Sequence, residues 1–264
     1  MKNIRRSLLI AGTSLYALLA LPASASTDDA LVKILETKKV RIAVPMDYAP
    51  YGFAGLDMKP KGYDIDMAQL IADKLGVKLE LISVTAPNRV PYLQTGKADM
   101  TISSLGKTAE REKVIDYSIA YAPFFDAVFG AKDLPVKTLE DLAGKTISVT
   151  RASMQDEELQ QMAPKAVVSR YEDNNATLSA FLSGHTQMFA SGTTVAAAIK
   201  QKNPKIDVEL KVILANSPCY VGLAKGQQRL LSKVNDIIRE AKSNGTLDDI
   251  SKRWLGAPAG NLPE

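Results

Sequence analysis

The stretch YDIDMAQLIADKLGVKLELISV, residues 63–84, contains the alternation of helix and strand on which the fold is built. Apolar side chains recur at helical spacing over residues 63–75, which predicts an amphipathic helix; they are Ile65, Ala68, Leu70, Ile71 and Leu75. Gly76 follows and readily ends a helix. Residues 77–84 then alternate apolar side chains with Lys78 and Glu80, which predicts a β-strand.

The same alternation continues on both sides of this stretch. Further strands are predicted over residues 40–44, 100–103, 146–150, 167–169 and 187–190. Further helices are predicted over residues 88–95, 138–142, 155–162, 175–182, 193–202, 227–244 and 247–254. This order is typical of parallel sheets with crossover helices, so the chain is predicted to be an α/β protein. No Gly/Ser-rich or Pro-rich linker separates the two series, which predicts that strands connect them and act as hinges.

The composition excludes several kinds of active centre. Of the 264 residues, 46% are apolar, which is ample for a buried core, but there is one histidine, His185, and one cysteine, Cys219. These counts exclude a Cys/His zinc site, an intrachain disulfide and a triad that needs a second histidine. We therefore expect no metal and no cofactor, and chemistry carried by carboxylates, guanidinium groups, hydroxyls and backbone amides.

The N-terminus has the three-part pattern of a secretory signal peptide. Basic residues at 2, 5 and 6 precede an uncharged apolar run over residues 7–21, and Ala23-Ser24-Ala25 supplies the small residues of a cleavage site. Residues 1–25 are therefore predicted to be a signal peptide that is cleaved after Ala25. Its removal leaves 30 Lys+Arg against 29 Asp+Glu, a net charge of +1 in place of +4. The mature chain is nearly neutral, so nucleic acid is not an expected partner.

Five motifs, in order and in register, resemble the periplasmic amino-acid-binding proteins of ABC importers (solute-binding protein family 3). They are Asp47-Tyr48-Ala49-Pro50-Tyr51, Lys61-Gly62-Tyr63-Asp64-Ile65-Asp66, Ser103-Ser104-Leu105-Gly106-Lys107-Thr108-Ala109-Glu110-Arg111, Leu139-Glu140-Asp141-Leu142-Ala143-Gly144-Lys145, and the ending from Gly245 to Gly256. The resemblance covers residues 38–256. Within it, Thr85-Ala86-Pro87-Asn88-Arg89-Val90-Pro91 resembles the branch that binds aspartate and glutamate.

The resemblance implies a two-lobed α/β fold, the type II periplasmic binding fold, with a hinge of two crossing segments. Lobe 1 would comprise residues 26–125 and 218–264, and lobe 2 residues 126–217. The implied function is a periplasmic, monomeric solute-binding protein that closes on a small carboxylate-bearing solute, an amino acid or related organic anion. Its partner would be the ABC permease in the inner membrane.

Arg111 is the leading candidate for ligand binding. Thr108 can cap a helix and place Arg111 in its first turn, where backbone amides are free. A planar guanidinium grips a carboxylate with two parallel hydrogen bonds. The resemblance assigns this position to the ligand's α-carboxylate, and it places the Ser103 carbonyl, the Ser104 hydroxyl and the residue at Gly106 against the ligand. Gly106 retains an amide but lacks the hydroxyl found in relatives.

Further candidates lie on the first strand's exit loop and in a short helix. The resemblance places an aromatic wall at Tyr48 and Tyr51, with a core tyrosine as the alternative for either. Asp47 could meet a cationic group. Arg89 aligns with the arginine that holds the distal carboxylate in the aspartate/glutamate branch, although a second arginine of that branch is missing at Pro45.

Lobe 2 departs from the family pattern. Where relatives carry a Gly-Thr-Thr turn, this chain has Ala152-Ser153-Met154, so backbone amides and Ser153 remain but Met154 replaces a hydroxyl. Asn174 aligns with a position that reads the ligand's side chain. Arg151 adds to Arg89 and Arg111 as positive charge expected near the cleft, which favours an anionic ligand.

The largest departure is Gly192, where the family has an aspartate that holds the ligand's α-ammonium group. A buried cation without a partner is costly. Either another acid has taken this role, with Asp47, Glu172 and Asp173 as candidates, or the ligand has no free α-amino group. The sequence leaves both alternatives open.

Two other functions were weighed against the binding protein. An enzyme of the cyclohexadienyl dehydratase kind needs a general acid, and Gly192 has no side chain to supply one. A periplasmic sensory partner of a receptor is the third possibility. No catalytic residue is assigned.

Overall fold

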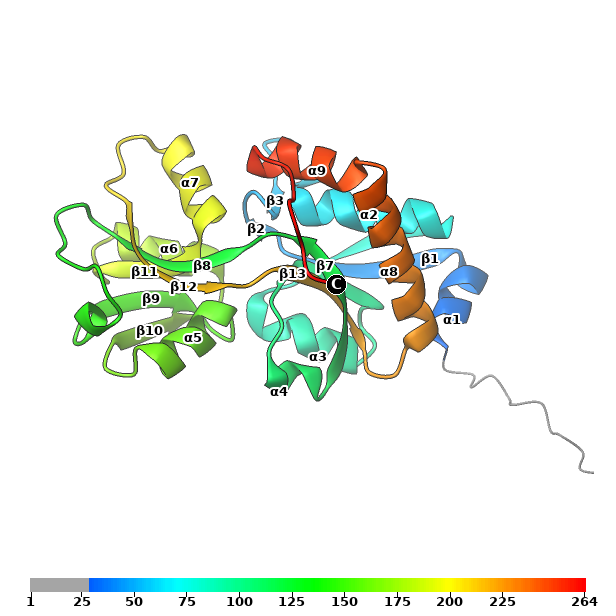
Figure 1. Ribbon diagram of the computed structural model, residues 1–264, viewed down its shortest axis with the longest axis horizontal. Coiled ribbons are helices and arrows are strands. Elements are labelled where there is room, and N and C mark those ends of the chain that lie inside the picture. The colour runs from blue at the N-terminus through cyan, green and yellow to red at the C-terminus, as the bar shows by residue number, and fades with distance from the viewer. Residues whose placement is uncertain (1–28) are drawn as a thin grey trace, which may run out of the picture.

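The computed structural model describes residues 29–264 and consists of two lobes side by side (Figure 1). The predicted signal peptide and its cleavage site at Ala25 lie outside the described residues. No helix in residues 29–264 is long and apolar enough to cross a membrane. The two-lobed α/β fold is the one predicted from the sequence.

The first lobe is built on a five-stranded sheet with the order β5-β1-β6-β13-β7. Its strands are β1 (Lys39–Val44), β5 (Lys78–Ser83), β6 (Met100–Leu105), β7 (Ile115–Ala122) and β13 (Cys219–Ala224). Strands β5, β1 and β6 are parallel, as predicted, whereas β13 is antiparallel to both β6 and β7. The predicted parallel pairing holds for these three strands, and β13 adds antiparallel pairing because it arrives from the second lobe without a crossover helix.

Helices cover both faces of this sheet. They are α1 (Ala30–Thr37), α2 (Tyr63–Leu75), α3 (Arg89–Gln94), α4 (Ala109–Glu112), α8 (Gln228–Ser243) and α9 (Thr246–Leu255), with a 3₁₀ turn, η1 (Ala86–Asn88). Helix α2 has the predicted bounds, buries Ile65, Ala68 and Ile71, and ends at Gly76 in the left-handed conformation, φ 67°. A small sheet, β2 (Asp47–Tyr48), β3 (Gly52–Ala54) and β4 (Pro60–Lys61), follows β1.

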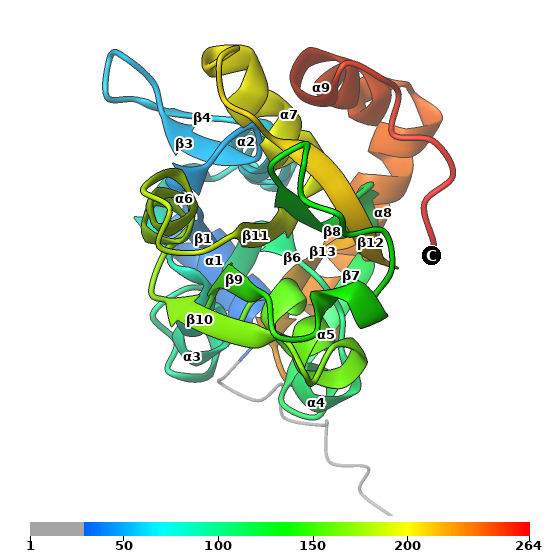
Figure 2. The ribbon, with the colours of Figure 1, turned by 90° about the vertical axis from the view of Figure 1, so that its left-hand side faces the viewer.

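The second lobe carries a five-stranded sheet with the order β10-β9-β11-β8-β12 (Figure 2). Its elements are β8 (Phe125–Gly130), η2 (Glu140–Leu142), β9 (Thr146–Thr150), α5 (Met154–Met162), β10 (Val167–Tyr171), α6 (Asn174–Leu182), β11 (Met188–Gly192), α7 (Thr193–Lys202) and β12 (Glu209–Asn216). This sheet is also mixed, because β8 is antiparallel to β11 and β12. Helix α5 packs on one face, and α6 and α7 pack on the other around Phe129 and Phe189.

The chain crosses between the sheets twice, from β7 into β8 and from β12 into β13, as the adjacent ribbons in Figure 1 show. The two crossings are hydrogen-bonded to each other, since the Ser217 amide donates to the Phe124 carbonyl over 2.9 Å. Cys219 begins β13 and is fully buried with a free thiol. Two short extended segments thus form the connection about which the lobes can rotate.

Candidate functional site

A narrow cavity lies between the lobes, beside the two crossings. Its walls come from both lobes and from the crossings themselves, and the residues are Tyr48, Ala86, Arg89, Ser104, Phe124, Asp126, Ser153, Met154, Gln155, Asn174 and Ser217. The cavity measures about 10 Å³, roughly the space of one water molecule. The lobes are therefore closed on each other, and polar groups from both converge on one small volume.

Arg89 carries an unpaired buried charge in the wall of this cavity. The side chain comes from the start of α3 and is 7% exposed. Its Nε is buried without a hydrogen-bond partner among the described residues. Burial, followed by the nearby charge of Arg111, lowers the pKa of the Arg89 guanidinium. A buried guanidinium without a partner is costly, so an anion in the cavity would stabilise this group.

Ser104 lines the cavity, but its hydroxyl is already engaged. It donates to Asp64 Oδ2 over 3.0 Å, and the Tyr121 hydroxyl donates to the other oxygen over 2.6 Å. Burial raises the pKa of Asp64 to about 6, against the effect of these two hydrogen bonds. The backbone of Ser104 has φ 48°, an unusual value for a serine, at the carboxyl end of β6. The Ser103 hydroxyl points elsewhere and pairs with Thr101.

Tyr48 and Tyr51 have different roles. The Tyr48 hydroxyl reaches across to the second lobe, where it lies 3.2 Å from Ser191 Oγ and accepts a hydrogen bond from the Gly192 amide. Tyr51 is fully buried and donates to the Pro123 carbonyl, so it follows the core alternative and does not line the cavity. Tyr48 is thus a wall residue that also connects the lobes.

Asp47 binds the second lobe in the closed form. Its carboxylate accepts hydrogen bonds from the Asn174 amide over 2.8 Å and from Asn174 Nδ2 over 3.1 Å. These donors belong to the first residue of α6, where backbone N–H groups lack helical partners. Asp47 is therefore occupied by protein groups, and Asn174 is fixed against both lobes.

Arg111 bridges the lobes at the edge of the cavity. Thr108 caps α4 and accepts from the Arg111 amide, as predicted. The guanidinium forms a 2.6 Å ion pair with Glu157 and donates to the Ala152 carbonyl, both on the second lobe. It also donates to the Gly106 carbonyl over 3.1 Å. The predicted carboxylate clamp would require a ligand to replace Glu157, so it stays a prediction.

Two glycines make room for bulky side chains. A Cβ at Gly106 would lie 2.5 Å from Met154 Cγ, and one at Gly192 would lie 2.4 Å from Phe124 Cζ. The departures noted at Gly106 and Met154 are therefore coupled: the methionine occupies the space that the glycine leaves. In the same way, the Phe124 ring occupies the space that the Cβ of a larger residue at position 192 would need. Ser153, by contrast, caps α5 by accepting from the Asp156 amide.

Asp126 lines the cavity on the second-lobe side, and the carboxyl group of Glu158 lies close to it outside the lining. Asp126 is fully buried and Glu158 is 8% exposed. Gln155 Nε2 donates to Asp126 Oδ1, but Asp126 Oδ2 and Glu158 Oε2 have no hydrogen-bond partner in the described part of the chain. Burial raises the pKa of both groups, and the nearby Asp126 raises that of Glu158 further. No such pair was expected from the sequence.

The acids and the arginine proposed for the cleft from sequence are engaged elsewhere. Arg151 pairs with Glu172, and both side chains are more than half exposed. Asp173 caps α6 by accepting from the Ala176 amide. Neither Glu172 nor Asp173 lines the cavity between the lobes. The clustering of three arginines in the cleft is therefore reduced to Arg89 in the wall and Arg111 at the edge.

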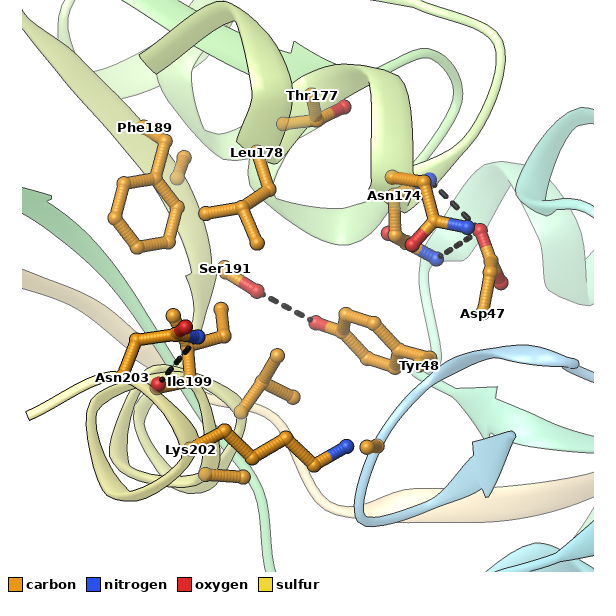
Figure 3. A pocket seen from close by; sticks show the side chains of 15 residues that line it. Asp47, Tyr48, Asn174, Thr177, Leu178, Phe189, Ser191, Ile199, Lys202 and Asn203 are labelled. Atoms are coloured by element: carbon orange, nitrogen blue, oxygen red, sulfur yellow. Dashed lines mark hydrogen bonds between the residues drawn. The ribbon is translucent and has the colours of Figure 1, made fainter. Parts of the chain in front are cut away.

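A second, larger cavity lies on the other side of Tyr48 (Figure 3). It measures about 180 Å³ and shares Tyr48 and Asn174 with the first cavity. Most of its other walls are apolar and come from α6, β11 and α7; they include Leu178, Phe189, Val195 and Ile199. Tyr48 points toward Ser191 in the wall of this larger cavity, and their hydroxyl oxygens are 3.2 Å apart (Figure 3).

The structure thus brings together Arg89, Ser104, Tyr48, Ser153, Met154 and Asn174 in one cavity. Asp47, Gly106, Arg111 and Gly192 contact its walls, whereas Ser103 and Tyr51 are fully buried and do not line it. Five residues in or beside the cavity walls were not predicted from the sequence: Asp64, Phe124, Asp126, Gln155 and Ser217. Asp126 carried a signal, because it is the one acid in the apolar run of residues 124–130. Among residues 29–264, no group of three or more His, Cys, Asp or Glu could hold a metal ion.

Comparison with known proteins gives one consistent result. A model of the family described as bacterial extracellular solute-binding proteins, family 3, matches residues 40–257. The ABC transporter glutamine-binding protein GlnH of Bacillus subtilis (strain 168) is 27% identical over 235 residues, which cover 87% of this chain and 86% of that protein. The L-cystine-binding protein TcyJ of Escherichia coli (strain K12) is 27% identical over 229 residues, covering 86% of each chain.

The same relationship holds among solved structures. An ancestral arginine-binding protein bound to arginine has a TM-score of 0.79 and 30% sequence identity, covering 83% of this chain and 99% of the other. The solutes named for these relatives are glutamine, cystine and arginine. The narrower resemblance to an aspartate/glutamate branch, drawn from residues 85–91, is not reflected in those names.

Proposed function

The chain belongs to family 3 of the bacterial extracellular solute-binding proteins, and we propose that it captures a small carboxylate-bearing solute between its lobes for delivery to a membrane permease. Its relatives named above are amino-acid-binding proteins, and GlnH is named as part of an ABC transporter. The chain is accordingly an amino-acid-binding protein of an ABC transporter and not an enzyme. The carboxylate contact, the closure mechanism and the permease step are the proposal.

The observation that carries the carboxylate contact is the unpaired guanidinium of Arg89. Its Nε is buried without a partner in the wall of the cavity between the lobes. A carboxylate offers two acceptor oxygens in the plane of the guanidinium and removes the cost of the unpaired charge. Arg111 differs, because its guanidinium already has the Glu157 carboxylate and two carbonyls as partners. We therefore assign the solute's carboxylate to Arg89.

Closure follows from the distribution of the cavity walls over both lobes. Arg89, Ser104 and Tyr48 belong to the first lobe, while Ser153, Met154 and Asn174 belong to the second. A solute that touches both sets binds the closed form better than an open one, and this difference in affinity drives closure. The closed form would then be the one that the permease in the inner membrane recognises. Residues 1–25, with cleavage after Ala25, would direct the chain to the periplasm.

The test compares Arg89→Met with Arg111→Met. The twenty standard L-amino acids and simple dicarboxylates are screened against the wild type by thermal shift, and the best ligand is measured by calorimetry. Arg89→Met should weaken binding by at least about 30-fold, because removing one partner of a buried charge pair costs 2–5 kcal/mol. Arg111→Met should weaken it less, through loss of the bridge between lobes.

Two results would contradict the proposal. A wild type that binds none of the carboxylates would exclude the solute class. An unchanged affinity in Arg89→Met, with strong loss in Arg111→Met, would return the carboxylate to Arg111, as the sequence analysis predicted.

A further inference from the structure

Asp126 has no part in the carboxylate contact, yet it lines the same cavity, with the carboxyl group of Glu158 close to it. Asp126 is the second residue of β8 and pairs directly opposite Gly192 in the antiparallel β8–β11 ladder. It is fully buried and lines the cavity together with Gln155 and Ser217. An acid is therefore present next to Gly192, contributed by a neighbouring strand rather than by residue 192 itself.

This acid lacks a counter-charge. Among the described residues, Gln155 Nε2 satisfies one oxygen of Asp126, and Oδ2 has no donor. Glu158 Oε2 is also buried without a hydrogen-bond partner among these residues. No lysine, arginine or histidine in residues 29–264 forms an ion pair with either group; Arg111 acts on both only at longer range. Two buried carboxyl groups without a cation require either a shared proton or a positive group from a ligand.

The opposite charge lies across the same cavity. Arg89 on the first lobe is 7% exposed and unpaired, and Asp126 on the second lobe is unpaired at Oδ2. Tyr48 lines the same cavity, and both charges act on its hydroxyl: Asp126 raises the pKa of Tyr48 and Arg89 lowers it. The cavity thus has a positive group, Arg89, on one lobe and an acidic group, Asp126, on the other, and each has a buried atom without a hydrogen-bond partner among the described residues. A molecule that carries both a carboxylate and an ammonium group matches this arrangement.

We propose that Asp126 holds the ammonium group of a zwitterionic amino acid whose carboxylate binds Arg89. The proposal rests on the proposed function and deepens it by restricting the solute to one with a free amino group. Asp126 would accept one N–H through Oδ2, and the Ser217 hydroxyl in the same wall can accept another. Phe124 fills the space in front of Gly192, so the ammonium is held from β8 rather than from residue 192.

The test begins with the unmodified protein. The standard L-amino acids are screened by calorimetry, and the tightest binder is compared with its des-amino carboxylic acid, such as glutaramic acid for L-glutamine. The amino acid should bind at least about 30-fold more tightly, since the des-amino acid leaves Asp126 unpaired. Asp126→Asn should remove most of this preference while the affinity for the des-amino acid stays the same or rises.

Glu158→Gln is the matched control. It removes one carboxyl group of the pair at nearly constant shape and leaves Asp126 in place, so the preference for the amino acid should persist. Circular dichroism of each variant at the assay temperature reports whether it is folded.

The possible outcomes distinguish a failure of the ammonium assignment to Asp126 from a failure of the proposed function. If des-amino acids bind the wild type as tightly as amino acids, Asp126 does not hold an ammonium group, and the carboxylate function stands. If Asp126→Asn is folded and keeps the preference, the assignment to Asp126 is wrong. If neither amino acids nor plain carboxylates bind, the proposed function fails, and the role of Asp126 fails with it.

Discussion

At the scale of single residues, the site is decided by which charges have partners. Arg89 and Arg111 are both arginines near one cleft, but Arg111 is paired with Glu157 and Arg89 is not. Because a buried unpaired charge is costly, the unpaired arginine is the one that gains most from a ligand. The same reasoning selects Asp126 over Asp47, whose carboxylate is already bonded to Asn174.

The buried acids also give the protein a predictable response to pH. Burial raises the pKa of Asp64 to about 6 and raises those of Asp126 and Glu158 as well. Over the range in which the folded state holds these protons and the unfolded chain has released them, stability falls as the pH rises. We therefore expect the ligand-free protein to melt several degrees lower at about pH 8 than at about pH 5.

Glu158→Gln should reduce this pH dependence, because it removes one titrating group whose pKa is raised by burial and by the nearby Asp126. Calorimetric melting of both proteins across this range provides the measurement. A melting temperature that rises steadily from pH 5 to pH 8 in the wild type would mean that the buried acids are ionised without cost.

At the scale of elements, the N-terminus of α6 joins the two lobes. Two aspartates accept hydrogen bonds from backbone amides at this N-terminus. Asp173 of the second lobe caps the helix, and Asp47 of the first lobe accepts from the amide of its first residue, Asn174. Both contacts satisfy backbone N–H groups that have no helical partner. Only the contact of Asp47 depends on the lobes being closed.

This difference leads to a paired prediction. Asp47→Ala should weaken ligand binding by about fivefold, with faster dissociation, because about 1 kcal/mol of closed-state stabilisation is lost. Asp173→Ala should instead lower the free energy of unfolding by about 1 kcal/mol and change affinity little. Calorimetry, stopped-flow dissociation and denaturant unfolding measure these effects. Equal effects of the two variants on affinity would show that Asp47 acts only as a cap.

At the scale of the whole molecule, the two crossings form the hinge and hydrogen bonds across the cleft hold it closed. The contacts that span the lobes include those of Asp47, Tyr48, Tyr51 and Arg111. We expect the ligand-free protein to be more extended and the ligand to decrease the radius of gyration until the scattering matches this closed structure. Small-angle scattering with and without saturating ligand is the test, with Arg89→Met as control. A radius of gyration unchanged by ligand would contradict hinge closure.

Much of the architecture could be predicted from the sequence, because it depends on patterns within a few residues. The spacing of apolar residues gave α2 and α7 their bounds, and Thr108 was identified as a helix cap from residue type alone. The strands β7, β8, β12 and β13 were not individually predicted, since their apolar runs carry no period that separates buried strand from connection. Their antiparallel pairing depends on contacts far apart in the chain.

The sequence by itself therefore determined the α/β class, the two series of elements and most of the residues that face the cleft. The tertiary structure alone decided which of those residues are free to bind. Arg111 and Glu157 meet only when the lobes close, and Asp126 and Gly192 are neighbours only because β8 and β11 pair. The physical reason is that secondary structure follows from local spacing, whereas the pairing of a charge depends on every group that folding brings within hydrogen-bonding distance.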